Sequence, residues 1–177
     1  MIIFNRKNMY FNVEDWLSGK TKILFIIGSS GSGKSTLSKN LSKKYNVEVI
    51  DMDVIWNKME IEDVNDPYGF EKKCDKITND LIKKYEIHKN KIIIDGIYPL
   101  WLKYPEDLNK FGIILIRKSV LLSSIRAAFR DRNSDWVKEL DSKFKLLKWF
   151  KDRFKLNMYA DTGIKFLLNV IKEKSFE

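Results

Sequence analysis

The feature that most constrains the fold of this 177-residue chain is a glycine-rich loop between an apolar run and a helix-like segment. The apolar run, residues 23–27, reads Ile-Leu-Phe-Ile-Ile and is typical of a parallel strand covered on both faces. Residues 28–35 then read Gly-Ser-Ser-Gly-Ser-Gly-Lys-Ser, and Leu37, Leu41 and Tyr45 follow at helical spacing. Strand, glycine-rich turn and helix in this order predict the first unit of an α/β fold.

The loop matches the Walker A pattern G-x-x-x-x-G-K-[ST], which binds phosphate. Its glycines let the backbone curl around an anion, with N–H groups pointing inward at the positive end of a helix dipole. Lys34 would reach the β- and γ-phosphates of ATP, and the Ser35 hydroxyl would ligate Mg²⁺. An accidental Gly/Ser loop is the alternative, but the flanking strand and helix disfavour it. The predicted nucleotide-binding residues of the loop are Gly28, Ser29, Ser30, Gly31, Ser32, Gly33, Lys34, Ser35 and Thr36.

Strand-like and helix-like patterns alternate along the rest of the chain. Further buried strands are predicted at residues 47–51, 91–95 and 112–117, with helical patterns at 66–85, from 120 to 129 and over 135–156. Residues 163–171 fit either a strand or a helix. The alternation predicts an α/β fold of the three-layer P-loop NTPase type, with a mostly parallel sheet of about five strands and helices on both faces.

Composition narrows the chemistry and the partners. Cys74 and His88 are the only residues of their types, which excludes an intrachain disulfide and a Cys/His zinc cluster, so a metal should be held by oxygen. No apolar run is long enough for a membrane span or a secretory signal, so we expect a cytoplasmic protein that does not bind membranes. The net charge of +9 comes from scattered lysines and supports a nucleic-acid partner only weakly.

Carboxylates end two of the predicted strands, at the edge where ligands bind in open α/β sheets. In an extended Asp-Met-Asp segment, Asp51 and Asp53 would point to one side, where one holds Mg²⁺ through water and the other accepts a proton from an attacking hydroxyl. The alternative is that one of them caps the following turn. Asp95 ends the next strand in the Walker B position, or simply forms an Asp-Gly turn. The predicted metal ligands are Ser35, Asp51 and Asp95.

Arginines gather after the last predicted strand. Arg126 and Arg130 lie one helical turn apart, with Arg132 close by and Arg117 at the end of the strand. Guanidinium groups stack on adenine and neutralise phosphate oxygens, so the cluster fits a phosphoryl-transfer site. An exposed basic helix face is the alternative.

From about residue 22 to 132, the chain resembles the adenylate-kinase-like branch of P-loop kinases, which includes nucleoside monophosphate kinases, shikimate and gluconate kinases and topology modulation proteins. The matching features are the loop, an acid with a nearby tryptophan (Asp53 and Trp56), a strand ending Asp-Gly-x-Tyr, and the spaced arginines. The resemblance implies that Arg126 stacks on adenine and that Arg130 contacts phosphates. The chain departs from topology modulation proteins in three ways. It has Ile97 where they have Asn, its tryptophan spacing differs, and it lacks a clear fifth strand after the arginine helix.

The sequence therefore predicts an ATP- and Mg²⁺-dependent phosphotransferase that moves the γ-phosphoryl group to a small acceptor, a nucleotide or related metabolite. Its catalytic residues would be Lys34, Asp53, Arg126 and Arg130. A polynucleotide 5′-hydroxyl kinase and a non-catalytic nucleotide-binding accessory protein are the alternatives. We expect residues 1–21 to form an arm or hairpin and residues 22–177 a P-loop kinase-like domain with a helical C-terminal part. Aromatic residues that either stack on the acceptor or belong to the core are Trp56, Tyr68 and Phe70.

Overall fold

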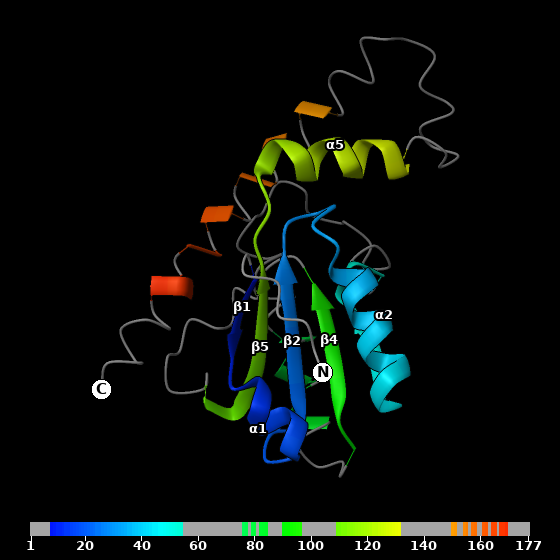
Figure 1. The fold of residues 1–177 in the computed structure, drawn as a ribbon, viewed down its shortest axis with the longest axis vertical. Coiled ribbons are helices and arrows are strands. Elements are labelled where there is room, and N and C mark those ends of the chain that lie inside the picture. The colour runs from blue at the N-terminus through cyan, green and yellow to red at the C-terminus, as the bar shows by residue number, and fades with distance from the viewer. Residues whose placement is uncertain are drawn as a thin grey trace.

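The computed structural model describes residues 8–54, 90–96 and 109–131, together with individual positions between 76 and 84 and between 150 and 169. The described residues form a five-stranded sheet in the order β1-β5-β2-β4-β3 (Figure 1). The fold class predicted from the sequence, a mostly parallel sheet of about five strands with helices, is confirmed. The strands are β1 (Asn8–Phe11), β2 (Ile23–Gly28), β3 (Glu48–Asp51), β4 (Ile92–Gly96) and β5 (Phe111–Ile116).

Strand β2 lies at the centre of the sheet, parallel to β4 on one side and to β5 on the other. All of its residues are buried, as its continuous apolar sequence predicts. β3 pairs in parallel with β4 on the far side. The carboxyl ends of these four strands therefore lie at one edge of the sheet.

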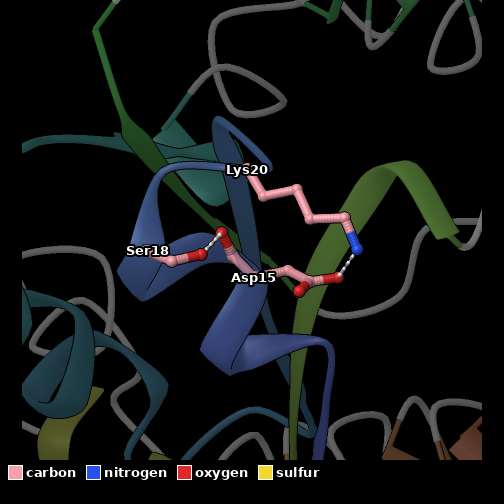
Figure 2. Close-up of polar contacts among 3 residues, drawn as sticks. All are labelled: Asp15, Ser18 and Lys20. Atoms are coloured by element: carbon pink, nitrogen blue, oxygen red, sulfur yellow. Dashed lines mark hydrogen bonds and ion pairs between the residues drawn. The ribbon is translucent and has the colours of Figure 1, made fainter.

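The fifth strand comes from the N-terminal segment. β1 pairs antiparallel with β5, with Met9 opposite Leu115. The short helix α1 (Val13–Ser18) follows and buries Trp16 against the sheet. Its end is held by local contacts: Ser18 Oγ donates to the Asp15 carbonyl and Lys20 Nζ pairs with the Asp15 carboxylate, each at 3.0 Å (Figure 2).

Helices cover both faces of the sheet because alternate residues of each strand point to opposite sides. On one face, Leu24 and Ile26 of β2 pack with α1 and with Leu41 of α2 (Lys34–Tyr45). On the other face, Ile23, Phe25 and Ile27 pack in one cluster with three residues of the C-terminal part. These are Ile164, Leu167 and Leu168.

The C-terminal part is helical at every described position between 150 and 169, which identifies the ambiguous segment 163–171 as helix where it is described. The described positions between 76 and 84 are also helical, in agreement with the predicted helix over 66–85. The rest of that helix, most of the segment 135–156, and the aromatic residues Trp56, Tyr68 and Phe70 lie outside the described residues. Within the described ranges, no helix is both long enough and apolar enough to cross a membrane.

Helix α5 (Val120–Asp131) lies across the carboxyl ends of the parallel strands (Figure 1). Ser119 begins it: its side chain accepts the backbone N–H of Leu122 at 3.1 Å, as an N-cap residue does. The face that α5 turns inward is made of small residues, since Ser123, Ser124 and Ala127 are buried. The glycine-rich loop lies beneath this face.

Candidate active site

The glycine-rich loop leads directly into the N-terminus of α2. The N-cap is Gly33, which has a left-handed φ of 101° and no side chain to cap the helix, and the first helical hydrogen bond runs from Leu37 N to Gly33 O at 3.1 Å. The N–H groups of residues 34–36 therefore have no acceptor within the helix. Ser35 and Thr36 are exposed at this point. The loop thus presents the open, positive end of a helix, where an anion is stabilised.

Gly31 is the closest contact between this loop and α5. Its φ is +80°, and a Cβ there would overlap the Ser123 carbonyl oxygen and lie 3.0 Å from the Ala127 nitrogen. Only glycine satisfies both the left-handed backbone and the close approach. The loop and the arginine-bearing helix are therefore in direct backbone contact.

Lys34 is buried although its side chain ends in an amine that is ordinarily charged. Its Nζ donates to the Ser29 carbonyl at 3.3 Å, within the loop itself. Burial lowers the pKa of Lys34, while the negative charges of Asp53 and Asp95 oppose that shift and the positive charge of Arg130 adds to it. Asp51 also acts on Lys34, so four other predicted site residues are within electrostatic reach of this amine.

Asp95 stands at the end of β4, within electrostatic reach of Lys34, and is only 2% exposed. Its Oδ2 accepts a hydrogen bond from Ser38 Oγ at 2.9 Å, whereas its Oδ1 is buried and accepts none from the described residues. Burial raises the pKa of Asp95, and the neighbouring Lys34 ammonium partly offsets the rise. One carboxylate oxygen is therefore held in place while the other lacks a partner.

Asp51 and Asp53 differ from the arrangement predicted for an extended chain. β3 ends at Asp51, which lies opposite Asp95 in the parallel register, and residues 52–54 turn into a helical conformation. Asp51 Oδ1 accepts the backbone N–H of Asp53 at 2.9 Å and that of Val54 at 3.4 Å. The prediction that both carboxylates point to one side of an extended strand is therefore wrong, because Asp51 caps the turn that ends the strand.

The arginines of α5 are exposed, and their charges reach different lysines. Arg130 influences Lys34, whereas Arg126 influences Lys118, a residue of the β5–α5 connection that the sequence analysis did not identify. The Nζ of Lys118 lies 3.6 Å from the position of a Cβ on Gly33. Burial and Arg126 both lower the pKa of Lys118. Two lysines thus flank the start of α2. In the sequence, the only sign that Lys118 lies at the site was its position just after β5, the strand beside β2.

Comparison with known proteins identifies the relatives of this chain. Residues 23–97 match the family model described as an AAA domain. Over 150 residues, 80% of this chain and 85% of the relative, the chain is 33% identical to a shikimate kinase of Clostridium botulinum (strain Loch Maree / Type A3). It belongs to the P-loop kinase family that includes the shikimate kinases. The resemblance seen in the sequence motifs is thereby confirmed.

Two solved structures also align with this P-loop kinase over most of its length. The deoxyadenosine kinase from M. mycoides gives a TM-score of 0.46 at 19% identity and covers 85% of this chain and 99% of its own. The shikimate kinase from Aquifex aeolicus gives 0.44 at 20% identity, with coverages of 87% and 98%. Because both scores are below 0.5, family membership rests on the sequence match.

The donor atoms of this P-loop kinase fit a hard cation such as Mg²⁺. Asp95 Oδ1 is a buried carboxylate oxygen without a hydrogen bond, and the exposed Ser35 hydroxyl stands on the first turn of α2. The described residues contain no group of three or more His, Cys, Asp or Glu side chains that could hold a metal ion. Magnesium tolerates such a sparse site because it retains water and binds substrate phosphates.

Asn157, in the C-terminal part, is a second residue that the sequence analysis missed. It is fully buried and hydrogen-bonded to the backbone of Ser30 in the glycine-rich loop, 127 residues earlier in the chain. An asparagine within a helical pattern carries no motif, so nothing in the sequence linked it to the loop.

Proposed function

We propose that this protein is an ATP- and Mg²⁺-dependent kinase that transfers the γ-phosphoryl group to a hydroxyl of a small metabolite. The observation that carries the proposal is the buried Lys34 ammonium at the N-terminus of α2, within the electrostatic reach of Asp53 and Asp95. A buried cation with acids near it, at a helix N-terminus that can bind an anion, suits phosphoryl transfer. In that reaction, positioning and charge neutralisation supply most of the catalysis.

The donor half of the proposed site is the loop from Gly28 to Thr36. Its N–H groups would bind the β- and γ-phosphates, and Lys34 would neutralise charge that develops on the transferred group. Ser35 and Asp95 would hold Mg²⁺, with Asp51 contributing its second oxygen through water. The ion would supply charge neutralisation and fix the orientation of the phosphates.

The arginines of α5 complete the proposed donor half. Arg130, whose charge already acts on Lys34, would contact the phosphates, and Arg126 would stack on the adenine. Lys118 would add a cation on the side of Gly33. Helix α5 would thus close the phosphate site from above, at the carboxyl edge of the sheet.

The acceptor half rests on Asp53. It stands in the turn after β3 and is partly buried. A hydroxyl acceptor needs a general base, whereas the phosphate of a nucleotide acceptor is already anionic. Shikimate is therefore the first acceptor to test, since relatives sharing about 85% of their length with this chain are named shikimate kinases, and nucleosides and nucleotides come next.

The proposal is tested by incubating the protein with γ-labelled ATP and a panel of shikimate, nucleosides, nucleotides, sugars and oligonucleotides, beside Lys34→Ala. We expect label on one class of small acceptor and none with the variant. Transfer that survives Lys34→Ala would refute the proposed mechanism. Label on oligonucleotides alone, with activity falling steeply as salt rises, would identify a polynucleotide kinase. ATP binding without transfer to any acceptor would identify a nucleotide-binding accessory protein.

A further inference from the structure

Asn157 joins three segments that are far apart in the sequence. Its Oδ1 accepts the backbone N–H of Ser30 at 2.9 Å, and its Nδ2 donates to the carbonyl oxygen of the same Ser30 at 3.2 Å. The same Nδ2 donates to Ser124 Oγ of α5 at 3.0 Å. Ser124 Oγ in turn donates to the Val120 carbonyl at 2.8 Å. A single amide thus connects the C-terminal part, the phosphate-binding loop and the start of α5.

The chemistry of this contact is specific to an amide. The two Nδ2 protons are used by two acceptors, and Oδ1 accepts one N–H, so each donor is satisfied in a fully buried position. Both backbone polar groups of one residue, the N–H and the C=O of Ser30, are engaged by the same side chain. Replacing the amide with an apolar group would leave both buried without that partner, which is costly in a low-dielectric interior.

The contact lies directly before the most constrained point of the loop. Ser30 precedes Gly31, whose left-handed backbone presses against the backbone of α5. Fixing the backbone of Ser30 therefore fixes the direction in which the chain enters Gly31 and the following phosphate-binding turn. The hydrophobic attachment of the same C-terminal part is made elsewhere, by Ile164, Leu167 and Leu168 in the core cluster.

We propose that Asn157 is a positioning residue that holds the loop in the conformation able to bind a nucleotide polyphosphate. This inference rests on the proposed function, because it assigns the loop a nucleoside di- or triphosphate as ligand. It predicts that polyphosphate affinity depends on a side chain that does not touch the ligand.

The test is calorimetric binding of Mg·ADP to the full-length protein and to Asn157→Leu, which removes the amide at similar volume. We expect the variant to bind Mg·ADP at least about tenfold more weakly, the fold-change that corresponds to one unsatisfied buried polar group. The matched control is Leu167→Ala, which weakens the packing of the same C-terminal part without touching the loop. Even where it lowers the melting temperature as much as Asn157→Leu does, Leu167→Ala should bind Mg·ADP with the affinity of the wild type.

Ser124→Ala separates the effect of the hydrogen bond to α5 from the effect of the hydrogen bonds to the loop. It removes the hydrogen bond to α5 and leaves both bonds to Ser30, so we expect Mg·ADP affinity within about twofold of the wild type. Hydrogen exchange on the ligand-free wild type adds a measurement that needs no variant: the Ser30 amide should be strongly protected.

Equal Mg·ADP affinity of Asn157→Leu and the wild type, equal weakening in Leu167→Ala, or rapid exchange of the Ser30 amide would each overturn the inference while leaving the proposed function standing. A wild-type protein that binds no Mg·ADP would instead overturn the proposed function.

Discussion

Two residues of opposite charge, Lys34 and Asp95, are both buried and lie within electrostatic reach of each other. Burial disfavours the charged form of each, and each partly offsets the cost for the other. Such a pair is poorly satisfied by itself, since Asp95 Oδ1 has no hydrogen-bond partner among the described residues. A bound polyphosphate with its cation would supply the missing partners. On the proposed function, these residues are arranged for a ligand rather than for stability.

The replacement Asp95→Asn tests this burial. Because the pKa of Asp95 is raised in the folded state, the native protein binds more protons than the unfolded chain between 3.8 and the folded pKa. The stability that this group contributes is therefore lost as pH rises through its folded pKa. We expect the free energy of unfolding of the variant, relative to wild type, to increase as pH rises above 3.8. Urea unfolding at several pH values measures it. A difference in the free energy of unfolding between variant and wild type that stays constant over that pH range would contradict the raised pKa.

Lys118 is the second cation at the loop, and Lys118→Ala tests its role. We expect Mg·ATP affinity to fall by about three- to fivefold, the size typical of a partly screened charge contact, with a shallower dependence on salt. Lys43→Ala, in the last turn of α2, is the control that removes an equal charge away from the loop. If both variants bind Mg·ATP equally well, Lys118 does not contact the phosphates.

The sequence predicted where residues lie when a local pattern defines their position, and it missed residues that only tertiary contacts bring to the site. The loop and Asp95 were identified because a motif and a strand end define them. Asp51 was predicted as a metal ligand. One of its oxygens caps the turn, because β3 ends at Asp51, and the sequence did not show where the extended chain ends. Lys118 and Asn157 were missed because only the folded chain brings them to the loop.

At the scale of elements, the site depends on the contact between the glycine-rich loop and α5. The inward face of α5 is small at Ser123, Ser124 and Ala127, which lets Gly31 approach its backbone. This geometry explains how a helix that begins 89 positions after Gly31 can lie directly against the loop.

Gly31→Ala measures this contact. A left-handed alanine costs roughly 1–2 kcal/mol, and overlap with the Ser123 carbonyl adds about 1–3 kcal/mol of overpacking. Gly19→Ala is the matched control, because Gly19 has a similar φ of +87° but only flexible lysine side chains nearby. We expect the Gly31 variant to lose more stability than the Gly19 variant in denaturant unfolding and also to bind Mg·ATP more weakly. Equal losses of stability would show that α5 does not press on the loop.

The strands and helices themselves were well predicted wherever a pattern of burial decides them. β2, β4 and β5 are buried along nearly their whole length and appear in the sequence as continuous apolar runs. β1 was harder, because an edge strand of four residues carries little pattern. The sequence shows no clear fifth strand after the arginine helix. The fifth place in the sheet is filled by β1, an antiparallel N-terminal strand beside β5.

At the scale of the whole molecule, the strand order creates the site. β2 lies beside β4, and β4 beside β3, so the loop, Asp95 and Asp51 come together at one edge although 67 positions separate Gly28 from Asp95. Helix α5 covers that edge (Figure 1). The C-terminal part supplies Asn157 from the opposite end of the sequence. We propose that this edge is a phosphoryl-transfer site with Asp53 as the base.

The role of Asp53 is tested by the rate of label transfer from γ-labelled ATP to the best hydroxyl acceptor, compared between wild type and Asp53→Asn. The variant should bind Mg·ATP within about twofold of the wild type while its transfer rate falls at least about 100-fold, the contribution typical of a general base. Transfer at the wild-type rate by Asp53→Asn, with unchanged ATP binding, would contradict the account.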